Sequence, residues 1–188
     1  MALYSDMIEL GTLAPQFTLP AANPGVDAAG DSMRSLSDYH DALAVVVVFM
    51  CNHCPYVKTI EKRLLVLANE MQPKGVQFIG ICSNDAERYP EDSFDNMRDR
   101  ALSRAYPFPY LHDESQEIAQ AYSAVCTPDF FVFDGDRKLC YRGRLDDGRP
   151  NIDPTTNDLR DALIEFLDSG SITVEQLPSM GCGIKWKE

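Results

Sequence analysis

Two cysteines with the spacing of a redox pair, Cys51 and Cys54, follow closely on an apolar run at residues 45–49. Four valines and a phenylalanine in a row predict a short strand covered on both faces. The residues after the pair repeat apolar side chains at helical spacing: Val57, Ile60, Leu64 and Leu67. The cysteines are therefore expected at a strand-to-helix turn, at or just before the N-terminus of the helix.

Such a position favours the ionisation of a thiol. Unpaired amide N–H groups and the positive end of the helix dipole stabilise negative charge there, and the thiolate is the form of cysteine that attacks disulfides. We expect a lowered pKa at Cys51, which would be the exposed, attacking sulfur. Cys54 is expected to be more buried and to resolve the mixed disulfide. A Cys-x-x-Cys motif beside a strand–helix–strand pattern is typical of redox proteins.

A structural zinc half-site is the main alternative use of Cys51 and Cys54. A closed zinc site needs four ligands, commonly two such pairs, and the chain has no second Cys-x-x-Cys. A c-type haem attachment needs a histidine directly after the second cysteine, where this chain has Pro55. The pattern therefore favours redox chemistry, with no metal and no cofactor.

Four further cysteines lie outside the pair. Cys82 and Cys140 fall within predicted strands and are expected to fill the core. Cys126 lies two residues before Pro128 and is interpreted either as a small packed apolar residue or as a third thiol that captures a disulfide.

The last cysteine, Cys182, lies in the tail between two glycines, which permit the backbone to swing. One interpretation is a mobile resolving thiol. The alternative is a docked tail, in which Ile184 and Trp186 pack on the core.

Composition limits the classes of function and the location. The net charge of −12 disfavours nucleic acid and anionic membranes as partners. No run of about 18 apolar residues is present, so no membrane span is expected. The first residues lack a basic region followed by an apolar core, so we expect no signal peptide and a cytoplasmic protein.

The remaining chain supplies the elements that must position the pair, within one domain over residues 1–188. Residues 1–40 are expected to form an N-terminal strand and hairpin extension, and residues 170–188 a C-terminal tail. Strands are predicted at 76–82, 107–111, 125–134 and 138–143, and helices at 91–105, 115–122 and 158–167. The strands on either side of the first helix form a parallel, right-handed unit. A solvated charge cluster is expected from Arg142, Arg144, Asp146 and Asp147.

This order of elements resembles the thioredoxin superfamily. The Gly-Thr-x-Ala-Pro-x-Phe-x-Leu opening at residues 11–19 and the Phe-Pro-Tyr-Leu-x-Asp segment at residues 108–113 resemble its redoxin branch, the alkyl hydroperoxide reductase and thiol-specific antioxidant (AhpC/TSA) relatives. The resemblance covers roughly residues 10–168. It implies an α/β, thioredoxin-like fold, with a central mixed β-sheet and helices on both faces.

The resemblance also implies roles for individual residues. Cys51 matches the attacking cysteine and Cys54 the resolving one. Pro128 matches a cis-proline that faces the redox pair, and a cis X–Pro bond is uncommon enough to have a positional purpose. The backbone of the preceding residue, Thr127, matches the position that pairs with an extended substrate chain.

Departures from the family pattern carry information as well. Val45 stands where thioredoxins have a buried aspartate, so a proton acceptor for Cys54 must come from water or from another element. His53 precedes the second cysteine and, as a polar or cationic neighbour, would stabilise the reduced form and raise the redox potential. Ala44 and Val48 stand where peroxiredoxins have proline and threonine, so the hydroxyl that positions peroxide is missing.

The sequence therefore predicts a thiol–disulfide oxidoreductase that acts on protein or small-molecule disulfides and dithiols. Its electron donor or acceptor would be a thioredoxin-type dithiol protein. Two alternatives stay open: a thiol peroxidase of the redoxin type, with an antioxidant role, and a non-catalytic metal- or partner-binding module on the same fold.

Overall fold

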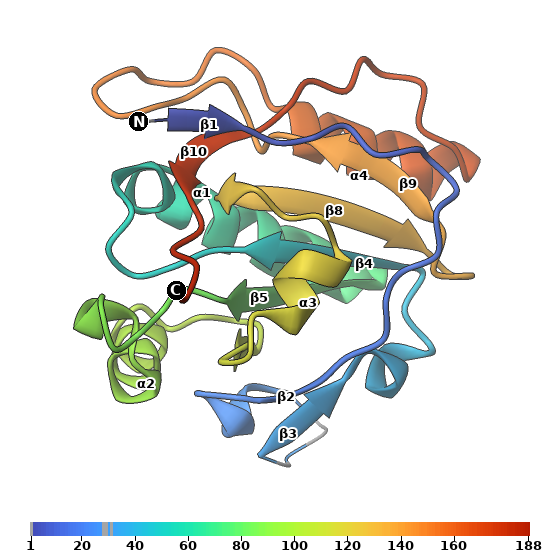
Figure 1. Ribbon diagram of the computed structural model, residues 1–188. Helices are drawn as coiled ribbons and strands as arrows, with labels where there is room; N and C mark the ends of the chain where they lie inside the picture. The colour runs from blue at the N-terminus through green and yellow to red at the C-terminus, as the bar shows by residue number, and fades with distance from the viewer. Residues whose placement is uncertain (1, 28–29, 31) are drawn as a thin grey trace.

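A central five-stranded sheet organises the computed structural model, which describes residues 2–27, 30 and 32–188 (Figure 1). The strand order is β6-β5-β4-β8-β9. The pairs β4–β5 and β5–β6 are parallel, and β8 is antiparallel to both β4 and β9. The strands are β4 (Ala44–Phe49), β5 (Val76–Cys82), β6 (Tyr110–His112), β8 (Asp129–Asp134) and β9 (Leu139–Gly143). This confirms the expected mixed sheet.

Helices cover both faces of this sheet, as the sequence predicts. One core joins α1, α2 and α4 to one face, and the other core joins α3 and the N-terminal segment to the opposite face. The helices are α1 (Pro55–Met71), α2 (Phe94–Ser103), α3 (Glu117–Ala121) and α4 (Asp158–Ser169), with short 3-10 turns at Pro24–Val26, Leu36–Tyr39, Gln72–Lys74 and Pro90–Asp92. Among the described residues, no helix is long and apolar enough to cross a membrane.

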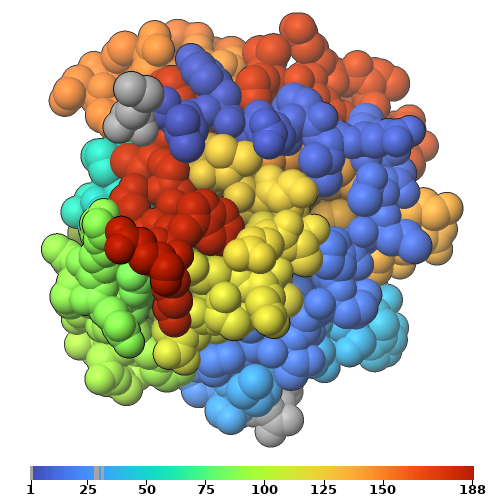
Figure 2. Space-filling model, in the orientation of Figure 1, coloured from blue at the N-terminus to red at the C-terminus, as the bar shows by residue number. Residues whose placement is uncertain are grey.

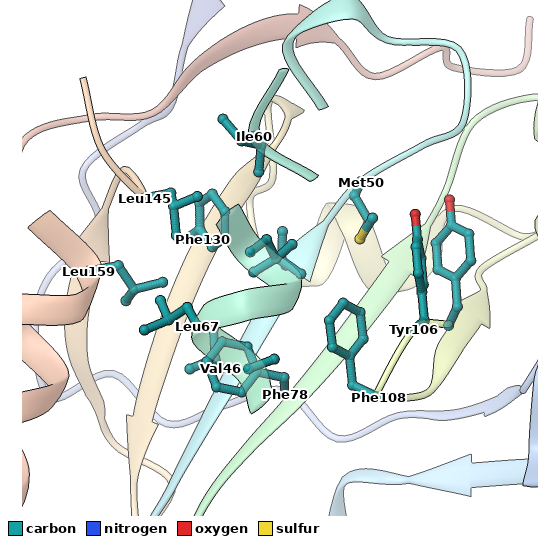
Figure 3. Packing of buried hydrophobic residues seen from close by; sticks show 14 of the residues in the cluster. Val46, Met50, Ile60, Leu67, Phe78, Tyr106, Phe108, Phe130, Leu145 and Leu159 are labelled. Atoms are coloured by element: carbon teal, nitrogen blue, oxygen red, sulfur yellow. The ribbon is translucent and has the colours of Figure 1, made fainter. Parts of the chain in front are cut away.

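The valine run explains why β4 lies at the centre. Alternate residues of a strand face opposite sides, so Val46 and Val48 enter one core while Val45 and Val47 enter the other. Figure 3 shows Val46 close to Leu67 of α1 and Phe78 of β5 in the first of these cores. A strand buried on both faces has to be apolar at every position.

Within the N-terminal segment, β2 (Thr18–Pro20) pairs antiparallel with β3 (Met33–Ser35). Residues 1, 28, 29 and 31 of the predicted extension lie outside the described residues.

Both ends of the chain meet in a second, three-stranded sheet that the sequence did not predict. Its order is β1-β10-β7, and both pairs are antiparallel. The strands are β1 (Ala2–Tyr4), β7 (Cys126–Thr127) and β10 (Met180–Gly183). The predicted C-terminal tail therefore contributes the central strand of this sheet, with β1 at one edge and β7 at the other. Figure 1 shows β1 beside β10.

Candidate active site

The Cys51–Cys54 turn lies between the end of β4 and the start of α1, as the sequence predicts. Cys54 is the N-cap residue of α1 and Pro55 is its first residue, where a missing N–H costs nothing. Both sulfur-bearing residues are buried, with exposures of 1% for Cys51 and 0% for Cys54. The expectation of an exposed Cys51 is therefore wrong. The tail covers the turn in this structure, with Cys182 packed against the same core cluster.

The peptide bond between Thr127 and Pro128 is cis, which confirms the sequence prediction. This loop faces the cysteine pair. The Thr127 hydroxyl lies 3.4 Å from the Cys51 sulfur, and the Cys54 thiol lies 3.1 Å from the Thr127 carbonyl oxygen. The structure thus brings Cys51, Cys54 and Thr127 into one cluster.

The ionisation of the pair differs from the sequence expectation. Interaction with Cys54, then burial and the negative charge of Asp92, raise the pKa of Cys51 well above its usual value. Interaction with Cys51 lowers the pKa of Cys54 to about 4, with further help from the Val57 backbone N–H and the Thr127 hydroxyl. The predicted low pKa at Cys51 is therefore wrong. Cys54 is the N-cap of α1, and the backbone N–H of Val57 in the first turn lowers its pKa without closing a side-chain cap hydrogen bond.

One contact opposes a charge on Cys54. The Thr127 carbonyl oxygen accepts a hydrogen bond only from the protonated thiol. Several donors act in the other direction, among them the backbone N–H groups of Val57 and Cys182. We therefore assign the first proton lost to the pair as a whole, with the charge mainly on Cys54.

Asp92 is the functional candidate that the sequence analysis missed. Its buried carboxylate accepts hydrogen bonds from the backbone N–H of Asn52 at 2.7 Å and of His53 at 3.3 Å, and from the Asn84 side chain at 2.8 Å. It therefore holds the peptide groups between the two cysteines. No sequence signal finds it, because it comes from a 3-10 turn far along the chain and only the fold brings it to the motif.

His53 is held by the same carboxylate. Its Nδ1 lies 2.6 Å from Asp92 Oδ2, and its ring stacks on Tyr89 with a centroid separation of 5.2 Å and an angle of 10°. The side chain is 22% exposed, so the ring stands between the turn and solvent. Any effect of His53 on the sulfurs is therefore shared with Asp92.

Cys51, His53 and Asp92 also form a group of candidate metal ligands, with one ligand atom of each within 4.8 Å of the others. The Asp92 oxygens are already occupied by the two backbone N–H groups, by Asn84 and by the imidazole. A closed zinc site needs four ligands. This arrangement fits a hydrogen-bonded turn better than a cation site.

The two candidate auxiliary thiols occupy different surroundings. Cys126 is completely buried, burial raises its pKa, and its sulfur lies 3.7 Å from the Pro128 carbonyl oxygen. Cys182 is only half-buried and lies opposite Thr127 in the β10–β7 register. The tail around it is docked through buried Ile184, whereas Trp186 is 39% exposed.

The loop that carries the cis-proline is supported by a buried ion pair between Asp129 and Arg142. A second contact between them measures 3.1 Å, and the guanidinium also lies over the Phe131 ring, 3.9 Å from its centroid. The expectation that Arg142 belongs to a solvated cluster is wrong. Its charge is compensated by Asp129, which lies beyond the proline on β8 and was not recognised as a partner.

The sheet order, the Cys-x-x-Cys turn before α1 and the cis-proline loop facing it define a thioredoxin-like fold. Consistent with this fold, the thioredoxin domain of a thiol-disulfide oxidoreductase from Bacteroides vulgatus superposes with a TM-score of 0.63 at 18% identity, covering 86% of this chain and 99% of that one. The chain belongs to the AhpC/TSA family, whose model matches residues 10–142.

Two solved structures are similar over nearly the whole chain. An uncharacterized conserved protein from Geobacillus kaustophilus is 49% identical with a TM-score of 0.92, covering 100% of this chain and 97% of that one. A hypothetical protein from Sinorhizobium meliloti is 39% identical with a TM-score of 0.90, covering 98% of both chains. No curated protein gives a significant match.

Proposed function

We propose that the protein is a thiol–disulfide oxidoreductase whose redox centre is the Cys51–Cys54 pair. One observation carries the proposal: the two thiols interact at the N-terminus of α1, next to the cis bond between Thr127 and Pro128. Membership of the AhpC/TSA family agrees with thiol chemistry. The exchange itself needs only sulfur atoms and protons, so the proposal includes no cofactor.

In the proposed reaction, Cys51 attacks a substrate disulfide and passes its proton to the Cys54 thiolate, with which it interacts. The bond between the two substrate sulfurs breaks, and a mixed disulfide with Cys51 forms. Cys54 then gives up its proton to the departing thiolate and attacks the Cys51 sulfur. The second substrate sulfur leaves as a thiolate, and the protein holds the disulfide. In this scheme the departing substrate thiolate takes up the proton of Cys54, so no acceptor is needed on β4, where Val45 is apolar.

The partners we propose are protein or small-molecule disulfides and dithiols, with a thioredoxin-type protein as electron donor or acceptor. Backbone pairing with Thr127 would orient an extended partner beside the sulfurs once β10, which pairs with this edge in the structure, has moved away. The net charge of −12 disfavours nucleic acid as a partner. Six unbridged cysteines suit a reducing compartment, and we propose the cytoplasm.

A thiol peroxidase is the second candidate, favoured by the family match. Its chemistry would need a group that positions peroxide near a thiolate. At the position where peroxiredoxins have a threonine, the chain has Val48, whose side chain is buried in the apolar core. We therefore rank peroxide reduction below disulfide exchange.

The proposal is tested with Cys54→Ser and Cys51→Ser variants and a fluorescent peptide disulfide. The wild-type protein should reduce the peptide catalytically in the presence of a thioredoxin reducing system, and Cys54→Ser should accumulate a mixed disulfide through Cys51. Cys140→Ser is the matched control, because that thiol lies on β9 away from the turn, and it should behave like wild type.

Two results would redirect the interpretation. Turnover of hydrogen peroxide, but not of the peptide, would favour the peroxidase. One bound zinc ion per chain, with Cys51 and Cys54 protected from alkylation, would favour the metal-binding module.

A further inference from the structure

The C-terminal strand lies where an extended partner of the redox pair would have to lie. Cys182 stands opposite Thr127, and Gly183 opposite Cys126, in an antiparallel register. An exposed strand edge is a common site for the addition of a peptide strand. Here β10 of the protein's own chain already fills the edge of β7 beside the two sulfurs.

This docking depends on an approach that only glycine permits. A Cβ added to Gly181 would lie 2.0 Å from the Thr127 carbonyl oxygen and 3.1 Å from the Pro128 nitrogen. Because the crowding atoms belong to the backbone, they could make room for the Cβ only if β10 or the cis-proline loop moved. The tail is therefore fitted to the cis-proline loop and does not merely lie across it.

Beyond β10, the tail is fastened by hydrogen bonds to the loops around the site. The Ile184 N–H donates to the Val125 carbonyl at 3.1 Å, and the Lys185 N–H donates to the Asn84 side chain at 2.8 Å. Gln116 donates to the Lys185 carbonyl at 2.8 Å. Figure 2 shows the last residues of the chain lying on the surface between the segments that carry α2 and α3.

The docked strand brings a third sulfur to the pair. The backbone N–H of Cys182 and its side chain both interact with the Cys54 sulfur. The turn and the tail therefore place three thiols in one cluster: Cys51, Cys54 and Cys182. Cys182 keeps partial exposure, whereas the other two are covered.

We propose that the tail is a tethered substrate and that Cys182 is a third redox cysteine. This inference rests on the proposed function, which supplies the oxidised pair. The Cys182 thiolate attacks the Cys54 sulfur of the Cys51–Cys54 disulfide. The Cys54–Cys182 bond forms, the Cys51–Cys54 bond breaks, and the electron pair leaves on Cys51, which takes up the proton that Cys182 lost. The protein remains oxidised by two electrons, and Cys51 becomes a free thiol.

The ionisation of Cys182 supports this direction of exchange. Burial, and then interaction with Cys54, raise the pKa of Cys182 to about 11, whereas the positive charge of Lys185 acts in the opposite direction. When Cys54 is part of a disulfide, it carries no negative charge. The Cys182 thiolate is therefore easier to form in the oxidised state, in which it has a disulfide to attack.

Disulfide mapping after acid quenching and alkylation tests the proposal. In wild-type protein oxidised with diamide, we expect both a Cys51–Cys54 and a Cys54–Cys182 bond. In Cys51→Ser, the Cys54–Cys182 bond should be the main product, with Cys126 alkylated only after unfolding. Cys182→Ser preserves a polar side chain of similar size and should show the Cys51–Cys54 bond alone.

Gly181→Ala provides a separate perturbation that leaves every sulfur in place. Its Cβ should displace β10 and lower the share of the Cys54–Cys182 bond about tenfold, the change that about 1.4 kcal/mol makes in an equilibrium. Gly25→Ala is the matched control, because a Cβ there has no neighbour within 4 Å, and its bond distribution should equal that of wild type.

The inference is overturned if wild-type protein holds only the Cys51–Cys54 bond and oxidised Cys51→Ser leaves Cys182 free. In that case, a normal rate of peptide reduction would keep the proposed function intact. The proposed function can also fail on its own. A Cys54–Cys182 bond in Cys51→Ser, without peptide turnover by wild type, would support the inference and reject the proposed function.

Discussion

The six cysteines form two groups that burial alone does not separate. One group surrounds the start of α1, and the other lies in the sheet and its loops: Cys51, Cys54 and Cys182 in the first, Cys82, Cys126 and Cys140 in the second. Cys54 and Cys82 are both completely buried. Yet burial raises the pKa of Cys82 to about 12, whereas the pKa of Cys54 is lowered to about 4.

The difference lies in which groups face the sulfur. Cys54 receives a hydrogen bond from Cys51 and N–H donors from the first turn of α1 and from the tail. Cys140 instead lies 3.4 Å from the Val132 carbonyl oxygen, an acceptor that favours the protonated thiol, and burial raises its pKa to about 12. A buried cysteine is therefore inert by default, and preorganised donors make it reactive.

The largest expected effect is on the titration of the thiols in the reduced protein, which tests this comparison directly. The reduced protein should gain one thiolate, followed by absorbance near 240 nm, with a midpoint near pH 4. Cys54→Ser should lose this step, and Cys140→Ser should keep it. A first thiolate that appears only above pH 8 would contradict the difference between the two groups.

The same shift makes the stability of the reduced protein depend on pH. The folded pKa of Cys54 is lowered, so its contribution is fully present above the unfolded thiol pKa of about 8.5 and is lost as pH falls towards 4. Denaturant unfolding should show the difference between reduced wild type and Cys54→Ser shrinking between pH 8 and pH 5. A difference that grows as pH falls would contradict the predicted sign of the Cys54 contribution to the free energy of unfolding.

Asp92→Asn is expected to have the next largest effect. The amide cannot accept every N–H that the carboxylate receives, so the free energy of unfolding should fall by about 1–3 kcal/mol. The Asp92 charge also raises the pKa of Cys51. In a Cys54→Ser background, the substitution should therefore lower the pH at which Cys51 reacts with iodoacetamide.

Asp95→Asn is the matched control, because this exposed carboxylate on α2 forms a surface ion pair with Arg98. It should change stability by less than about 0.5 kcal/mol. An unchanged Cys51 reaction profile in Asp92→Asn would mean that the carboxylate supports only the backbone of the turn.

Much of this arrangement could be predicted from local patterns. The valine run specifies a strand buried on both faces, and apolar spacing specifies α1. The Cys-x-x-Cys and Thr-Pro motifs locate the turn and the loop that faces it. Each of these features depends on a few neighbouring residues, so the hydrophobic periodicity and the turn residues of the sequence are enough to predict it.

The rest depends on contacts between distant segments. Asp92 meets the cysteine turn, Arg142 meets Asp129, and β10 inserts beside Thr127 only after the chain folds. The wrong expectation of a low pKa at Cys51 has two origins: the raising charge of Asp92 comes from a distant segment, and Cys54, not Cys51, is the N-cap of α1. Partial charges at helix ends act over the first turn only.

Cys126→Ala should affect stability more than redox chemistry. The side chain is buried near the cis-proline loop, and its truncation is expected to cost about 1 kcal/mol in the free energy of unfolding. The rate of peptide disulfide reduction should equal that of wild type. Loss of turnover in folded Cys126→Ala would move this cysteine into the reactive group.

The smallest expected effect is on the redox potential, and it tests whether the imidazole of His53 acts on the two sulfurs. His53→Phe can keep the stacking on Tyr89 but removes the contact of Nδ1 with Asp92. If the imidazole stabilises the reduced pair, the redox potential should fall by about 10–30 mV, since 30 mV corresponds to about 1.4 kcal/mol for two electrons. Equilibration with glutathione of known poise measures the potential. His40→Phe, at an exposed histidine, is the control and should leave it unchanged. A rise in potential in His53→Phe would show that the carboxylate, not the imidazole, dominates at the turn.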